Sequence, residues 1–249
     1  MPEWLQAGGW GLLAGSALLV GAAIGWFARV PQRVIASIMA FGAGVLLSAV
    51  SFELIAEAHA QGGLLPTVLG AAVGAVVYTL ANVALARHGA RHRKRSGDQQ
   101  PSESEQPGSG SALAVGALLD GVPESVVIGA SLLSGGAVSL VTVAAVFLSN
   151  VPEGLSSAAG MRQAGRPRRY VFLLWTGIAL ISGAAALVGN TLLGGAPPEV
   201  LAGITALAAG AILAMITDTM VPEAFENAHL LVGLITVAGF LTAFALSHT

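Results

Sequence analysis

Long apolar runs constrain the fold of this chain more than any other feature of its sequence. Each contains about 20 largely apolar residues, the length that a helix needs to cross the hydrocarbon core of a bilayer. The chain is 55% hydrophobic and only 10% charged, whereas about a quarter of a soluble domain is charged. The sequence therefore predicts an all-α polytopic membrane protein, with a single transmembrane domain over residues 1–249 and the lipid bilayer around it. Eight runs are expected to span, at residues 4–27, 34–56, 64–86, 112–134, 137–160, 171–194, 200–221 and 229–247.

The connection between the third and fourth runs, residues 87–111, has a different composition. It reads "RHGARHRKRSGDQQPSESEQPGSGS", which is basic at first and then rich in Ser, Pro, Gly and acidic residues. Such a segment has few apolar side chains with which to build a core, so we expect it to be disordered.

The distribution of positive charge predicts an orientation. All 11 Lys and Arg residues fall in connections that follow an odd-numbered run. Connections rich in Lys and Arg face the cytoplasm, which makes the 87–111 connection cytoplasmic and places the N- and C-termini outside. We expect an integral protein of a bacterial-type inner membrane.

Several classes of function are disfavoured by what the sequence lacks. It has no cysteine, so a metal would have to be held by oxygen or imidazole ligands. The sequence has no HExxH motif, no Ser-His-Asp set and no phosphate-binding Gly loop with Lys, which argues against an enzyme or an ATP-driven pump. It also lacks a basic helix with interleaved aromatic residues, so no nucleic-acid partner is expected. No permanent cofactor is expected either.

Two neighbouring runs carry nearly the same polar sequence in their interior. A shift of 29 residues lays "DGVPES" (120–125) over "SNVPEG" (149–154). A proline inside a helix leaves the carbonyl four residues earlier without its usual donor, so each repeat supplies a free oxygen. Polar residues three or four apart share one helical face. The first face holds Asp120 and Glu124, and the second holds Ser149, Asn150 and Glu153.

A second internal similarity, at a shift of 166, relates the second run to the seventh. It aligns "AGVLLSAVSFELIAEA" (43–58) with "AGAILAMITDTMVPEA" (209–224). Because these runs cross in opposite directions, the pattern is that of an inverted repeat. It predicts a 3+2+3 arrangement, with runs one to three mirrored by runs six to eight around the central pair. Such repeats place a substrate site near the bilayer midplane.

The carboxylates of the central pair need compensation. A charge at the bilayer centre costs between roughly 2.5 and 10 or more kcal/mol, and two adjacent carboxylates do not both stay ionised without a partner. No Lys or Arg lies in any predicted span, so we expect a metal cation or a proton to supply the positive charge. The structural alternative is that both Glu residues are neutral and hydrogen-bonded to backbone carbonyls.

These features together resemble the ZIP family of divalent metal transporters. In that family the fourth and fifth of eight helices each carry a motif of the type His-Asn-x-Pro-Glu-Gly, and these residues line a binuclear metal site. The likeness covers nearly the whole chain outside residues 87–111. The positions that match the motif are Pro123, Glu124, Asn150, Pro152 and Glu153.

The chain also departs from the family motif. Asp120 and Ser149 stand where the two His residues are expected, Gly121 stands in place of Asn, and Ser125 in place of Gly. A site of carboxylates, carboxamide, hydroxyl and carbonyl is harder than one with imidazoles and suits manganese, iron(II), magnesium or calcium relatively better. Because Gly121 has no side chain, a second bound ion is not expected.

The resemblance implies alternating-access transport of a divalent cation, with zinc, iron, manganese and cadmium as candidates, into the cytoplasm. Two rival functions stay open: a proton-coupled carrier of another solute, and a sensor or scaffold that does not transport. Small residues in the spans allow close helix contacts and a homodimer. The predicted metal ligands are Asp120, Glu124, Ser149, Asn150, Glu153 and Asp218.

Further acidic and His residues mark a predicted route to and from the site. Asp218 should lie within the apolar layer, where its alternative role is a structural hydrogen bond. The other residues lie at the ends of two spans, where the alternative is a solvated helix end. The predicted entrance contains Glu53, Glu57 and His59, and the predicted exit contains Glu223, Glu226 and His229.

Overall fold

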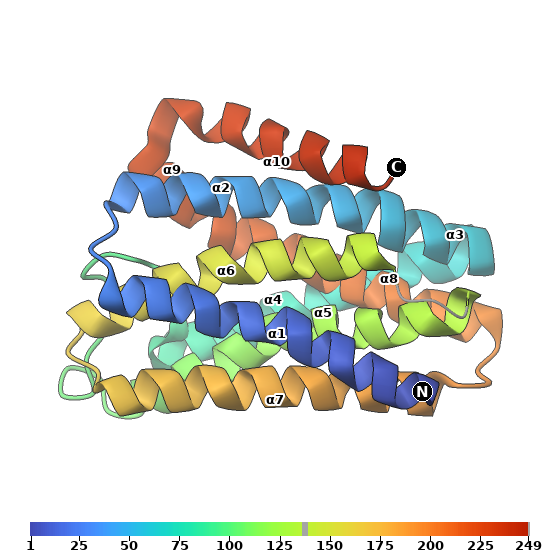
Figure 1. The fold of residues 1–249 in the computed structure, drawn as a ribbon, viewed down its shortest axis with the longest axis horizontal. Coiled ribbons are helices and arrows are strands. Elements are labelled where there is room, and N and C mark those ends of the chain that lie inside the picture. Colours follow the sequence, from blue (N-terminus) through green and yellow to red (C-terminus); the bar gives the residue numbers. More distant parts are fainter. Residues whose placement is uncertain (136–138, 249) are drawn as a thin grey trace.

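A computed structural model describes residues 1–135 and 139–248, and this part of the chain is helical with no strand. Seven of its helices are long and apolar enough to cross a membrane, and an eighth apolar helix, Val232–Leu246, is shorter. The helices lie side by side along one long axis (Figure 1). An integral membrane protein built of apolar helices is therefore the class that the fold defines. Residues 136–138, where the predicted fifth run begins, lie outside the described residues.

The helices follow the predicted runs closely, and several have π-helical continuations, written η. The first half contains α1 (Glu3–Phe27), α2 (Gln32–Ala49), η1 (Val50–Ile55), α3 (Ala56–Gly62), α4 (Leu64–Leu85) and η2 (Ala86–Ala90). The second half contains α5 (Ser109–Gly135), α6 (Leu140–Gln163), α7 (Arg168–Leu193), α8 (Pro198–Met215), η3 (Ile216–Met220), α9 (Val221–Ala228), the 3-10 turn η4 (His229–Leu231) and α10 (Val232–Leu246).

Glycine and proline set the boundaries of several helices. The single residue Gly63 separates α3 from α4, and its φ of 77° lies in the left-handed region that glycine adopts without a Cβ penalty. Pro31, Pro167 and Pro197 immediately precede α2, α7 and α8, because a fixed φ and a missing N–H are tolerated at a helix start. The connections at these points are short, so the neighbouring helices run antiparallel.

Close helix contacts are made by glycines. The helix α2 packs against α10, and α4 packs against α8. A Cβ at Gly44 or Gly239 in the first pair, or at Gly74 or Gly210 in the second, would overlap a backbone carbonyl oxygen of the facing helix. These small residues are therefore used in packing within the chain.

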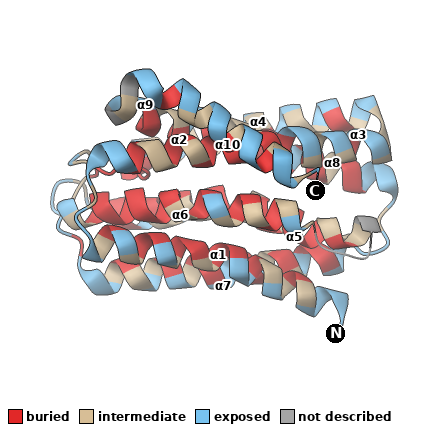
Figure 2. Cartoon of the chain, turned by 45° about the horizontal axis from the view of Figure 1, so that its top comes forward, coloured by how far each residue is buried: buried red, intermediate tan, exposed pale blue. Residues whose placement is uncertain are grey.

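The burial pattern separates a central helix from bilayer-facing ones. Most of α6 is buried, and it packs mainly between α1 and α2 (Figure 2). In contrast, α4 buries only Thr67, Gly74 and Tyr78, and its outer face carries exposed apolar side chains such as Val76 and Leu80. An apolar exterior around a polar interior is the arrangement expected of a protein surrounded by lipid.

The segment between η2 and α5, residues 91–108, differs from the disordered connection that its composition predicts. It lies at the end of the bundle opposite both chain termini (Figure 1), and it buries Arg93, Lys94, Ser96 and Gln100. The composition argument considered only apolar burial. The segment is instead held by polar contacts with the helices, which the apolar content of a sequence does not report.

A group of these contacts joins the segment to the residues just before α7. The side chain of Arg166, just before α7, donates to Glu103, to the carbonyl of Pro101 at 3.1 Å and to Ser109 Oγ at 2.6 Å. The hydrogen bond from Arg166, together with backbone N–H groups of Gly108 and Gly110, lowers the pKa of Glu103 to about 2. Glu103 is therefore ionised over the whole physiological pH range.

Candidate functional site

Three carboxylates of the central helices are buried together. Asp120 and Glu124 lie four residues apart on α5, and Glu153 lies on α6, with exposed fractions of 3%, 2% and 5%. Both helices continue through their internal prolines, Pro123 and Pro152. The carboxyl group of Glu124 is close enough to Glu153, Lys94 and Asp120 to interact with all three electrostatically. The doubled Pro-Glu pattern, together with Asp120, thus gathers negative charge in the interior of the helix bundle.

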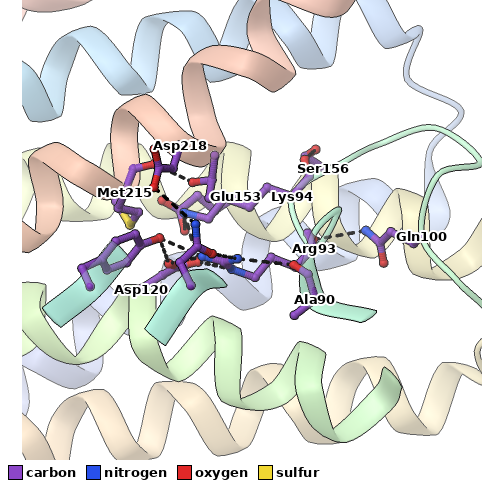
Figure 3. A network of polar contacts seen from close by, with 12 residues as sticks. Ala90, Arg93, Lys94, Gln100, Asp120, Glu153, Ser156, Met215 and Asp218 are labelled. Carbon is purple, nitrogen blue, oxygen red and sulfur yellow. Dashed lines mark hydrogen bonds and ion pairs between the residues drawn. The ribbon is translucent and has the colours of Figure 1, made fainter. Parts of the chain in front are cut away.

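Asp120 is held by an arginine from the 91–108 segment (Figure 3). Arg93 donates from Nε to Oδ2 and from Nη2 to Oδ1, both at 2.9 Å, in a bidentate pair. The Tyr78 hydroxyl donates to the same Oδ1 at 2.7 Å. Burial lowers the pKa of the Arg93 guanidinium, but Asp120, Tyr78 and Glu153 together raise it by more, so this pKa lies above its ordinary value and Arg93 stays charged. Most of the acceptor capacity of Asp120 is therefore used within the protein.

Glu153 is next to a lysine from the same segment. Lys94 Nζ lies 2.8 Å from Glu153 Oε2 and 3.4 Å from Asp120 Oδ2, and Lys94 is only 5% exposed. The sequence analysis looked for counter-ions within the spans and found none. The structure corrects that argument, since two compensating positive charges enter the bundle from a connection instead of from a helix.

Two carboxylate oxygens in this region are without a partner in the described structure. Glu124 Oε1 and Glu153 Oε1 are buried and accept no hydrogen bond. The buried Trp175 Nε1 likewise donates none. Such groups are rare because each costs about 1–3 kcal/mol of desolvation. An orphaned acceptor next to a small cavity, as at Glu153, indicates a site that takes a further donor or a cation.

A small cavity adjoins Glu153 and Trp175. Its volume is about 10 Å³, which is room for about one water-sized particle. Asp120, Asn150 and Glu153 are among the residues that line it, together with Trp175 and Lys94. Glu124 is not among the lining residues, so the cavity is asymmetric between the two helices.

The two remaining polar residues of the α6 repeat are engaged by the backbone. Asn150 Nδ2 donates to the carbonyl of Ala14 on α1 at 2.9 Å, while the Ser149 hydroxyl donates to the carbonyl of Val146 at 2.9 Å. Asn150 borders the cavity and Ser149 does not. Of these two predicted ligands, Asn150 is thus the one that the structure brings to the carboxylates.

Asp218, in η3, lies at the edge of the polar network (Figure 3). It is exposed, and Asn82 Nδ2 lies 3.4 Å from its Oδ2. The Oδ1 of the same Asn82 accepts a hydrogen bond from Arg93 Nη1 at 2.7 Å. Asp218 is therefore linked to Asp120 through Asn82 and Arg93 and does not contact the cavity.

The predicted exit residues hold the 91–108 segment. Glu223 is 1% exposed and accepts from Ser96 N at 3.0 Å, Ser96 Oγ at 2.7 Å and Ser156 Oγ at 3.2 Å. Arg95 forms ion pairs with Glu223, at 3.5 Å, and with Glu226. These two acids anchor the connection beside Lys94. The side chain of the third predicted exit residue, His229, lies outside the described part of the structure.

The predicted entrance residues lie toward the opposite end and are not drawn together around a common point. Glu53 Oε2 lies 3.3 Å from Ser139 Oγ, Glu57 accepts from Gln61 Nε2 at 2.8 Å, and His59 is exposed. Within residues 1–135 and 139–248, no three His, Cys, Asp or Glu side chains are close enough together to hold a metal ion. Neither predicted cluster, nor the set Asp120, Glu124 and Glu153, is therefore a preformed metal centre in this conformation.

Four residues of the site were not identified from the sequence, and all lie outside the Pro-Glu helices. They are Tyr78 and Asn82 on α4 and Arg93 and Lys94 in the connection. The run Arg93-Lys94-Arg95 is visible as a charge cluster, but such clusters are usually solvated. Only the fold shows that each of its members reaches a carboxylate.

Comparison with protein-family models and with curated proteins found no match to this chain. The functional argument therefore rests on the residues and their geometry.

Proposed function

We propose that this chain is a ZIP-like secondary transporter that moves a divalent metal cation through the carboxylates of α5 and α6. The observation that carries the proposal is that the carboxylates Asp120, Glu124 and Glu153 are buried, and that cationic groups from outside the spans pair with two of them, Asp120 and Glu153. Intramembrane carboxylates mark ion pathways by default. A site that accommodates an ammonium group beside Glu153 has the charge and the space that a cation needs.

Charge balance favours a divalent substrate. Asp120 is neutralised by its bidentate pair with Arg93, which leaves Glu124 and Glu153 as the carboxylates available for exchange. Two carboxylates match one divalent cation. Carboxylate, carboxamide and water oxygens suit manganese or iron(II), and zinc and cadmium also accept carboxylate ligands.

The proposed 3+2+3 inverted repeat has support from the backbone. The π-helical segments η1 and η3 begin at Val50 and Ile216, which are 216 − 50 = 166 residues apart, the same shift that aligns the sequences. The close-contact glycines Gly44 and Gly210 share this spacing. Moreover, α8 contacts α3 while α2 contacts α9, as antiparallel repeats require. In our proposal eight helices cross the bilayer, with α10 as the eighth.

The proposed orientation follows from charge. Both termini lie at one end of the bundle and the basic 91–108 segment lies at the other (Figure 1). By the positive-inside rule the segment faces the cytoplasm of a bacterial-type inner membrane, and the termini face outside. Cations would then enter from the end of Glu53 and leave past the Lys94 segment, by alternate exposure of one central site.

The test is uptake by proteoliposomes that contain the full chain. Manganese, iron(II), zinc, cadmium and magnesium are each offered to wild type, Glu153→Gln and Glu124→Gln. Glu199→Gln is the matched control, because Glu199 is an exposed carboxylate in the first turn of α8. We expect at least one divalent cation to enter with wild type and Glu199→Gln, and the two site variants to lose most of that uptake.

The two rival functions give different results in the same vesicles. A proton-coupled carrier of another solute would show pH-dependent transport that chelators do not affect. A sensor or scaffold would admit no cation with wild type under any pH gradient, and that result would overturn the transporter proposal.

A further inference from the structure

Lys94 differs from the other charged residues of the site in how it is held. Its Nζ lies within ion-pair distance of Glu153 and Asp120, yet among the described residues it makes no hydrogen bond of good geometry. Arg93, in contrast, donates to Asp120, Tyr78 and Asn82 and to the carbonyl of Ala90 at 3.3 Å. Arg93 is thus fixed in place, whereas Lys94 is held mainly by charge.

The residues on either side keep Lys94 close to the carboxylates. Arg93 is anchored on Asp120, while Arg95 and Ser96 are anchored on Glu223. A group tethered at both sides has a high effective concentration at its binding site. Lys94 therefore competes strongly for Glu153 although its own contacts are few.

Lys94 and a divalent cation next to Glu153 would repel each other. The cavity of about 10 Å³ that Lys94 lines has room for one water-sized particle. Two cations a few ångströms apart in a region of low dielectric repel one another strongly. The charge repulsion therefore favours the departure of Lys94 Nζ when a divalent cation binds next to Glu153.

We infer that Lys94 is the resident cation of the carboxylate site and that a divalent cation binds Glu153 only after Lys94 withdraws. Lys94 then sets the affinity of the site, because binding is weakened by the fraction of molecules in which the site is already filled. This inference rests on the proposed function, since it concerns the same carboxylates.

The experiment measures equilibrium binding of Mn²⁺ to the full chain in lipid nanodiscs, with free Mn²⁺ followed by electron paramagnetic resonance. Wild type is compared with Lys94→Met and Lys94→Gln, which remove the charge, and with Lys94→Arg, which keeps it. The control is Arg91→Met, because Arg91 is an exposed cation three residues earlier in the same segment. Thermal unfolding of each variant establishes that it is folded. If either Lys94→Met or Lys94→Gln does not fold, the binding comparison uses the other.

We expect Lys94→Met and Lys94→Gln to bind Mn²⁺ at least about tenfold more tightly than wild type. A tenfold gain corresponds to a wild type in which Lys94 fills roughly nine-tenths of the sites. Lys94→Arg and Arg91→Met should keep an affinity close to that of wild type. If wild type binds Mn²⁺ and the uncharged variants bind it no more tightly, the inference is wrong and the proposed function stands. If no variant and no wild-type sample binds Mn²⁺ or any other divalent cation tested, the proposed function itself fails.

Discussion

The Nζ atom of Lys94 lies 2.8 Å from Oε2 of Glu153, so a residue of a polar connection reaches a carboxylate in the interior of α6. Both side chains are nearly fully buried. A buried ion pair is stable only when both partners are present, because either charge alone is left desolvated. The path of the 91–108 segment and the charge state of the α5–α6 site are therefore linked.

The Arg93–Asp120 pair makes a first prediction about stability. We expect Arg93→Met to lower the free energy of unfolding by about 3–5 kcal/mol, because Asp120 would be left buried and unpaired. The double variant Arg93→Met/Asp120→Leu should recover part of that loss. Denaturant unfolding in mixed micelles measures both, with Arg91→Met as a control expected to change stability by about 0.5 kcal/mol or less. Equal losses in the single and double variants would show that the pair is not the cause.

Glu223 makes a second prediction, about access to the 91–108 segment. In Glu223→Gln the Ser96 hydrogen bonds and the Arg95 ion pair lose a charged acceptor, each worth about 1.5–3 kcal/mol. Trypsin should then cut after residues 93–95 roughly tenfold faster, since cleavage follows the open population. Glu57→Gln, at the other end of the bundle, should leave the rate unchanged. A protected segment in Glu223→Gln would contradict the anchoring role.

The glycine contacts make a third prediction, about helix packing. A methyl group at Gly210 would overlap the carbonyl oxygen of Ala71 on α4, whereas Gly203, on the same helix, has nothing within 4 Å of an added Cβ. Gly210→Ala should destabilise the protein by about 1–3 kcal/mol through overpacking. Gly203→Ala should be neutral or stabilising by up to about 1 kcal/mol. Thermal unfolding of the two variants side by side checks this, and similar midpoints would contradict the close α4–α8 contact.

His92 makes a fourth prediction, about pH. Burial lowers its pKa below the ordinary value of 6.5, and the neighbouring Arg95 and Arg91 lower it further. The unfolded segment then binds a proton more readily than the folded one, so stability falls as the pH drops below 6.5. Below pH 6.5, amide hydrogen exchange of residues 91–100 should be faster in wild type than in His92→Gln at the same pH. Above pH 7 the two proteins should exchange at the same rate. If the ratio of the exchange rates of wild type and His92→Gln is the same at pH 7.5 and pH 5.5, the prediction for His92 is wrong.

The spans could be predicted from the sequence because their signal is local. Each is a continuous apolar run, and the structure gives α4 and η2 over Leu64–Ala90 and α7 over Arg168–Leu193 where runs at 64–86 and 171–194 were predicted. The burial of Glu124 and Glu153 could be anticipated for the same reason, since both lie inside such runs.

The partners of these carboxylates could not be predicted, because Lys94 and Glu153 are 59 residues apart in the sequence and meet only through the fold. The composition of residues 87–111 predicts a solvated chain, and it reports nothing about specific ion pairs. For the same reason the role of Glu223 as an anchor for Ser96 was not visible in the sequence.

Chemical labelling of Lys94 tests the relation between this residue and the substrate most directly. Lys94 is the only lysine of the chain, so an amine-reactive reagent modifies this side chain and the N-terminus, which mass spectrometry of peptides distinguishes. In nanodiscs without divalent cations we expect Lys94 to be protected in wild type and to react in Glu153→Gln. Adding Mn²⁺ should expose Lys94 in wild type, because the cation takes its place at Glu153. If Lys94 of wild type is labelled to the same extent with and without saturating Mn²⁺, this result contradicts the exchange of Lys94 for a divalent cation.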